Sequence, residues 1–112
     1  MFVFVCRNTS EARAYLLGAG MYSDRRKFPF PEAIVSDVRI GEDSGLHFLQ
    51  WLRDIPNLTD IPVIMLTGSA SQREMDIATN LGAVKVLRKP SDVNRLKEML
   101  LKVIAQLCPA AN

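Results

Sequence analysis

The sequence lacks the features that mark several classes of protein. Its 112 residues hold no apolar run long enough to span a membrane. The formal net charge is only +2, and Lys and Arg are scattered, so we expect neither a nucleic-acid partner nor a membrane partner. The glycine-rich patterns GxGxxG and GxxxxGK are both missing, which argues against a nucleotide-binding loop.

Cysteine is also scarce. Cys6 and Cys108 lie near opposite ends, and neither belongs to a CxxC pattern or a Cys/His cluster. This usage predicts reduced thiols in a cytoplasmic protein, and neither a disulfide nor a metal site. The apolar start over residues 2–6 is short and follows no cationic segment, so it predicts a strand and no leader peptide.

Short apolar runs alternate with helical patterns along the rest of the chain. Strands are expected over 2–6, 33–38, 61–66 and 84–87, and helices over 8–17, 46–52, 75–81 and 92–107. The last helix should turn Leu96, Met99, Leu100, Val103, Ile104 and Leu107 inward. This order predicts an α/β fold, with a parallel sheet covered by helices, in a single domain of residues 1–112.

Three residues stand at the carboxyl ends of successive predicted strands: Asp37, Thr67 and Lys89. In open α/β sheets the functional site lies beyond those ends. A carboxylate can attack phosphorus, a hydroxyl can donate to phosphoryl oxygens, and an ammonium can neutralise their charge. Each residue alone is more often a cap, a turn former or a solvated side chain, but the three together predict a phosphoacceptor site.

The motifs around these residues are IVSDVRIGEDSG at 34–45, IPVIMLTG at 61–68 and GAVKVLRKP at 82–90. They resemble the receiver domain of bacterial response regulators. The resemblance implies a flavodoxin-like doubly wound parallel sheet, with Asp37 as phosphoacceptor and Thr67 and Lys89 beside it. It also implies that Gly68 and Pro90 line the phosphate pocket, and that Gly45 is the turn glycine before the next helix.

The same resemblance implies a role in two-component signalling and no enzyme activity of its own. The phosphoryl donor would be a histidine kinase or a phosphotransfer protein. Phosphorylation would then alter binding to a downstream protein partner. A phosphatase-like hydrolase is disfavoured, because Arg39 stands where such enzymes carry a second Asp.

The pattern departs from the family at the N-terminus, since about four βα units are found where receivers have five. The missing unit would carry the acidic pair that holds Mg²⁺, which leaves Asp37 and the Arg39 carbonyl as the main ligands. We therefore expect Mg²⁺ binding to be weak or absent. Arg7 could replace the cation electrostatically, or it could pair with Asp37. The alternative function is a degenerate pseudo-receiver that acts as an interaction or dimerisation module without phosphorylation.

The departure also leaves the position of the first strand open. Residues 1–20 could be the family's second βα unit, with a gap beside the strand of Asp37. Residues 1–7 could instead lie directly beside that strand and close a four-stranded sheet. We favour the second arrangement, or strand exchange or edge pairing in a homodimer, because a gap leaves backbone groups unpaired.

Overall fold

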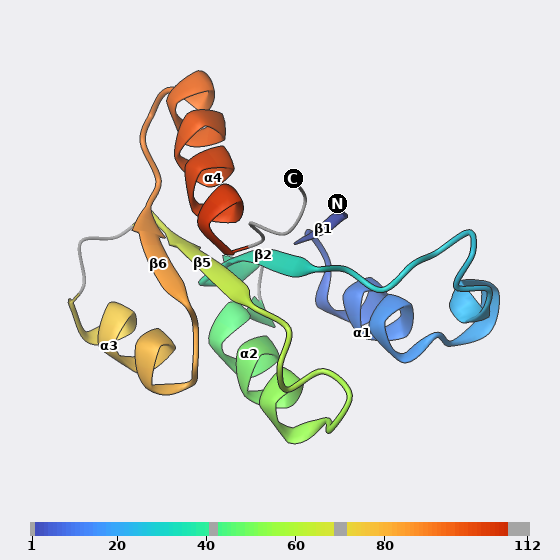
Figure 1. Ribbon diagram of the computed structural model, residues 1–112. Coiled ribbons are helices and arrows are strands. Elements are labelled where there is room, and N and C mark those ends of the chain that lie inside the picture. The colour runs from blue at the N-terminus through green and yellow to red at the C-terminus, as the bar shows by residue number, and fades with distance from the viewer. Residues whose placement is uncertain (1, 41–42, 69–71, 108–112) are drawn as a thin grey trace.

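The computed structural model describes residues 2–40, 43–68 and 72–107. Four strands form one parallel sheet in the order β1-β2-β5-β6, and helices cover both of its faces (Figure 1). The elements in chain order are β1 (Val3–Cys6), α1 (Thr9–Leu17), the 3₁₀ turn η1 (Gly20–Ser23), β2 (Ala33–Asp37), β3 (Arg39–Ile40), β4 (Asp43–Ser44), α2 (Gly45–Asp54), β5 (Val63–Thr67), α3 (Gln72–Asn80), β6 (Lys85–Arg88) and α4 (Val93–Leu107). The doubly wound α/β fold predicted from the sequence is confirmed.

Local chemistry explains most of the element bounds. Asn8 caps α1 by accepting from the Glu11 N–H, and Ser44 caps α2. Gly18, which ends α1, has the left-handed φ of 67° that favours glycine. The predicted strand 61–66 begins later, at Val63, because the Ile61 N–H already bonds to Leu58 in a turn.

A small hairpin that the sequence did not reveal precedes Gly45, the turn glycine expected before the next helix. Its strands β3 and β4 pair antiparallel, with Arg39 opposite Ser44 and Ile40 opposite Asp43. Gly41 and Glu42 lie outside the described residues, as do Ser69, Ala70, Ser71 and Cys108. The hairpin carries the chain from the end of β2 into α2.

The first strand lies directly beside the strand of Asp37. β1 pairs parallel with β2, from Val3 opposite Ala33 to Cys6 opposite Ser36. β2 in turn pairs with β5, and β5 with β6. Of the two arrangements considered, the structure therefore has the one without a gap, and β1 forms an edge of the sheet.

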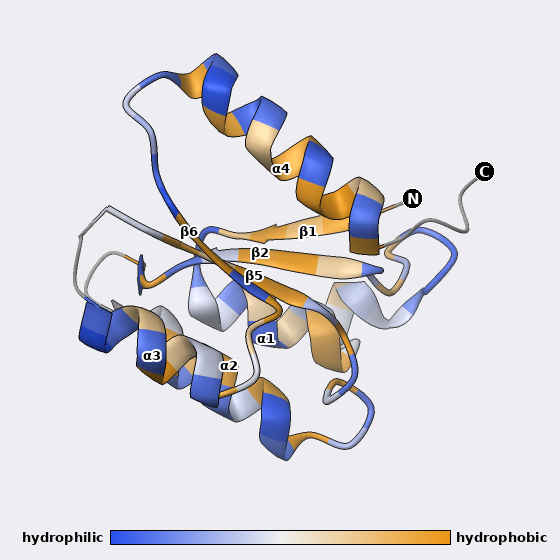
Figure 2. Cartoon of the chain, turned by 60° about the vertical axis from the view of Figure 1, so that its left-hand side comes forward, coloured by the Kyte–Doolittle hydropathy of each residue, from blue (hydrophilic) through white to orange (hydrophobic). Residues whose placement is uncertain are grey.

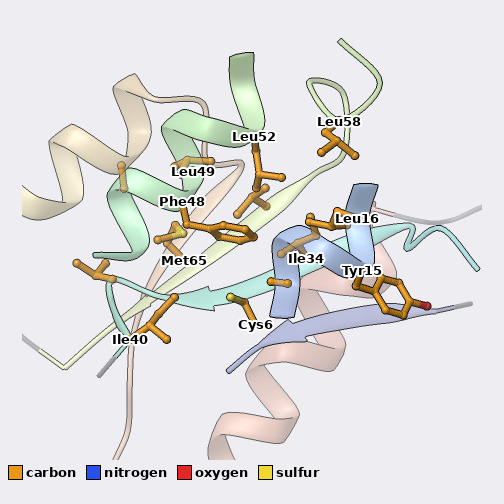
Figure 3. Close-up of a cluster of buried hydrophobic side chains, with 14 residues drawn as sticks. Cys6, Tyr15, Leu16, Ile34, Ile40, Phe48, Leu49, Leu52, Leu58 and Met65 are labelled. Carbon is orange, nitrogen blue, oxygen red and sulfur yellow. The ribbon is translucent and has the colours of Figure 1, made fainter. Parts of the chain in front are cut away.

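Alternate side chains of the central strands enter two separate cores. Ile34, Val63 and Met65 pack on the face covered by α1, α2 and α3, around the fully buried Phe48 (Figure 3). The opposite face of the same strands is covered by α4 alone (Figure 2). Its cluster contains Val35, Ile64, Leu66, Val103 and the partly buried Leu96, Leu100, Ile104 and Leu107. Met99, also expected to face inward, is half-buried and lies outside this cluster.

The long loop between η1 and β2 packs against α1. The Tyr15 hydroxyl donates to the Pro29 carbonyl at 2.8 Å, and the Phe28 ring meets the Tyr15 ring edge-on. Arg25 lies over the Phe30 ring, 4.3 Å from its centroid. Among the described helices, none combines the length and the apolar character that crossing a lipid bilayer requires.

Candidate functional site

The three predicted strand-end residues meet at one edge of the sheet. Asp37 is the last residue of β2, Thr67 is the last of β5, and Lys89 follows β6 directly. Parallel register brings them together, because Asp37 lies opposite Leu66 and Thr67 lies opposite Arg88. The ladder extends one step further, since the Lys89 N–H donates to the Thr67 carbonyl at 2.8 Å.

Lys89 contacts Asp37 through its side chain. The Nζ atom donates to Asp37 Oδ2 at 2.8 Å, and each side chain is 38% exposed. The other carboxylate oxygen, Oδ1, accepts no hydrogen bond from the residues that the structure describes. The ammonium is therefore already placed beside the carboxylate, while one carboxylate oxygen keeps its lone pairs available.

A cavity of about 460 Å³ opens beside this pair. It is lined by Asp37, Val38, Arg39, Leu66, Thr67, Gly68, Glu74 and Lys89. Thr67 is buried, at 3% exposure, while a Cβ added at Gly68 would meet nothing within 4 Å. Pro90, which was predicted to line the pocket, follows Lys89 in the chain and does not line this cavity. The space beside Gly68 is open to a ligand.

Gly45 fixes how closely α2 approaches the carboxylate strand. A Cβ at this position would lie 1.8 Å from the Asp37 carbonyl oxygen, well inside contact distance. The Gly45 N–H also donates to the Val38 carbonyl at 2.8 Å. Only a residue without a side chain lets the start of α2 close against the backbone of Asp37.

One functional candidate escaped the sequence reasoning. Glu74, in the first turn of α3, faces the cavity, and its carboxylate lies 3.7 Å from the Arg39 guanidinium. The sequence singled out the backbone carbonyl of Arg39 as a ligand, and in the structure Arg39 also lines the cavity and pairs with Glu74 through its side chain. Glu74 could have been predicted from its position, because it lies in the first turn of the helix that follows Thr67.

A second cavity, of about 410 Å³, lies towards α4 and shares Asp37, Arg39 and Lys89 with the first. Arg7, which follows β1, lines it. Arg7 forms no ion pair with Asp37 among the described residues. Of the described residues, Lys89 is therefore the one that pairs with the Asp37 carboxylate.

The described donor set offers few oxygen ligands to a divalent cation. Mg²⁺ takes oxygen ligands and favours carboxylates and water. Within the described residues, no group of three or more His, Cys, Asp or Glu side chains comes together. Among the charged residues that line the two cavities in the described part of the chain, three are cationic (Arg7, Arg39 and Lys89) and two are acidic (Asp37 and Glu74). The described part of the pocket is built to receive an anion.

Comparison with known proteins gives a consistent assignment. The family model "Response regulator receiver domain" matches residues 5–101. The chain is 33% identical over 70 residues to the polar-differentiation response regulator DivK of Brucella ovis. That match covers 62% of this chain and spans 57% of the length of the relative.

Solved structures with the same fold are also response regulators. The phosphorylated cyanobacterial phytochrome response regulator RcpA superposes with a TM-score of 0.82 at 22% identity, covering 96% of this chain and 74% of that one. The Mn²⁺-bound form of response regulator Rcp1 gives a TM-score of 0.74 at 25% identity, covering 88% and 69%. The likeness to RcpA, at 22% identity, shows the fold alone.

Proposed function

This chain belongs to the family of response regulator receiver domains, and from that premise we propose that Asp37 accepts a phosphoryl group and that this changes the chain's binding to other proteins. The observation that carries the proposal is the contact between Lys89 Nζ and Asp37 Oδ2 at 2.8 Å, beside a cavity large enough for a phosphoryl group. The chain acts as a signalling protein and not as an enzyme with a substrate of its own.

The geometry supports a direct displacement at phosphorus. Asp37 Oδ1 forms the new O–P bond while the bond from phosphorus to the leaving group breaks, and the leaving group departs with the electron pair. Lys89 neutralises charge on the transferred group, and the Thr67 hydroxyl donates to one of its oxygens. The open space beside Gly68 holds the remaining oxygens.

The donor is a histidine kinase or a phosphotransfer protein, and the product binds a downstream protein partner. The supporting observation is that the matched relatives are named response regulators and that the matched family model is a receiver domain. A cytoplasmic location and a single domain over residues 1–112 remain predictions.

Treatment with acetyl phosphate in the presence of Mg²⁺ tests the proposal. We expect intact-mass spectrometry to show one added phosphoryl group on the wild type and none on Asp37→Asn. Asp60→Asn, an exposed residue outside both cavities, is the matched control and should label as the wild type does. A wild type that never labels, or an Asp37→Asn variant that labels fully, would contradict the assignment.

A second function, an interaction module that works without phosphorylation, is favoured by the edge of the sheet. Strand β1 pairs with β2 on one side and with no described strand on the other, and Val5 is 49% exposed. An apolar edge strand of this kind is a template for pairing with another strand. A homodimer formed through β1 is the form of this function that the edge supports.

A further inference from the structure

The described charges near Asp37 include several cations. The two cavities meet at Asp37, Arg39 and Lys89, and the second adds Arg7. Three residues with cationic side chains therefore line the cavities at one carboxylate nucleophile. The only other carboxylate lining either cavity is Glu74, among the described residues, and it already pairs with Arg39.

The cations suit the charge that phosphorylation creates. An aspartate carries one negative charge, whereas its acyl phosphate carries nearly two at neutral pH. A guanidinium presents several N–H groups in a plane and can bind two phosphoryl oxygens at once. Arginines beside the acceptor can thus supply the neutralisation that a divalent cation would otherwise provide.

We propose that this pocket accepts the phosphoryl group without a divalent cation, with Arg7 and Arg39 joining Lys89 around the transferred oxygens. This inference rests on the proposed function, because it assumes that Asp37 is the acceptor. Lys89 holds Oδ2, and Oδ1 attacks phosphorus as a carboxylate, so no proton has to be removed from the nucleophile. With acetyl phosphate, the P–O bond breaks and acetate leaves as an anion, so no proton donor is needed.

To take this role, the Arg39 side chain has to give up its ion pair with Glu74. The free-energy cost of that exchange is small. The Arg39 side chain is 84% exposed, and the ion pair spans 3.7 Å. The Glu74 side chain is 21% exposed, but the arginine end of the pair lies in solvent, where ion pairs contribute little to stability. A dianionic phosphoryl group at Asp37 therefore competes effectively for the Arg39 guanidinium. When the guanidinium binds the phosphoryl group, the contact between Arg39 and the first turn of α3 changes.

The test compares labelling by acetyl phosphate in EDTA and in Mg²⁺, on the full chain, by intact-mass spectrometry. The wild type should label at closely similar rates in both. Arg7→Gln and Arg39→Gln should each label about tenfold more slowly in EDTA. Loss of an enclosed oxyanion donor slows a reaction by ~100- to 1,000-fold. The smaller effect is expected here because both arginines are exposed. Arg26→Gln, an exposed arginine outside both cavities, should label as the wild type does.

Charge-conserving variants separate the electrostatic role from a structural one. Arg7→Lys and Arg39→Lys should retain most of the rate in EDTA, since they keep a cation in the pocket. Circular dichroism should give the same spectrum for all variants. Labelling that needs Mg²⁺ and disappears in EDTA would overturn this inference and leave Asp37 as the acceptor. No labelling of the wild type in either condition would overturn the proposed function as well.

Discussion

Lys89 reaches across the end of the sheet to Asp37, with 2.8 Å between Nζ and Oδ2, although 52 positions separate the two residues in the chain. The contact exists because β5 lies between β2 and β6 and carries both in parallel register. The sheet, and not local sequence, places the ammonium beside the carboxylate.

The first prediction concerns Lys89 itself. Lys89→Met should lower the rate of phosphoryl labelling by about 100-fold, because the transferred group loses its nearest cation. The free energy of unfolding should change by less than about 1 kcal/mol, since a pair this exposed contributes little stability. Acetyl phosphate labelling and urea unfolding measure the two effects.

Lys85→Met is the matched control for that prediction. Lys85 begins β6, the strand that Lys89 follows, and it is exposed and lines neither cavity. Its substitution should leave the labelling rate unchanged. An equal loss of labelling in both variants would mean that the charge of the whole protein, and not the contact with Asp37, controls the reaction.

The second prediction concerns the approach of α2 to β2. Gly45→Ala should lower the free energy of unfolding by roughly 2–4 kcal/mol, because the new methyl group would overlap the Asp37 carbonyl oxygen and push the helix away. Urea unfolding followed by the fluorescence of Trp51, which packs beside Phe48 on α2, measures the loss.

Gly68→Ala provides the comparison for Gly45→Ala. A methyl group there would enter open space, so stability should stay the same or rise by up to about 1 kcal/mol through the lower entropy of the unfolded chain. Similar losses in both variants would show that the closeness of Gly45 to Asp37 does not determine the stability of this region.

The sequence predicted the candidate site better than its surroundings. Asp37, Thr67 and Lys89 could be predicted to meet because each ends an apolar run, and parallel strands end at a common edge. The pairing of Arg39 with Glu74 could not be predicted, since it depends on how α3 is rotated against the sheet. The β3–β4 hairpin was hidden for a different reason, because two-residue strands carry no detectable period.

The third prediction tests the open edge of β1. If the chain dimerises through this edge, Val5→Lys should shift the equilibrium towards the monomer, because a charged side chain on an edge strand opposes pairing with another strand. Sedimentation equilibrium over a range of protein concentrations measures the shift. Val84→Lys replaces an equally apolar side chain, 43% exposed, just before β6, and should leave the equilibrium unchanged. A wild type that stays monomeric throughout would contradict the dimer.

The last prediction concerns pH and the thiol of Cys6, a buried residue of the core in Figure 3 that also lines the second cavity. Burial is the main cause that raises the pKa of Cys6 from its ordinary 9.0 to about 11, with a further rise from the charge of Asp37. The unfolded chain therefore loses this proton near pH 9, while the folded chain keeps it until about pH 11.

Because the folded state holds the proton more tightly, the contribution of Cys6 is fully present below pH 9 and is lost as the pH rises towards about 11. At about 1.4 kcal/mol for each pKa unit, the loss approaches 2–3 kcal/mol at the upper end. Urea unfolding at several pH values should show a steeper decline in the free energy of unfolding for the wild type than for Cys6→Ala, which lacks the thiol. If the free energy of unfolding falls in parallel with pH for the two proteins, the Cys6 thiol has the same pKa in the folded and unfolded states, and burial does not raise that pKa.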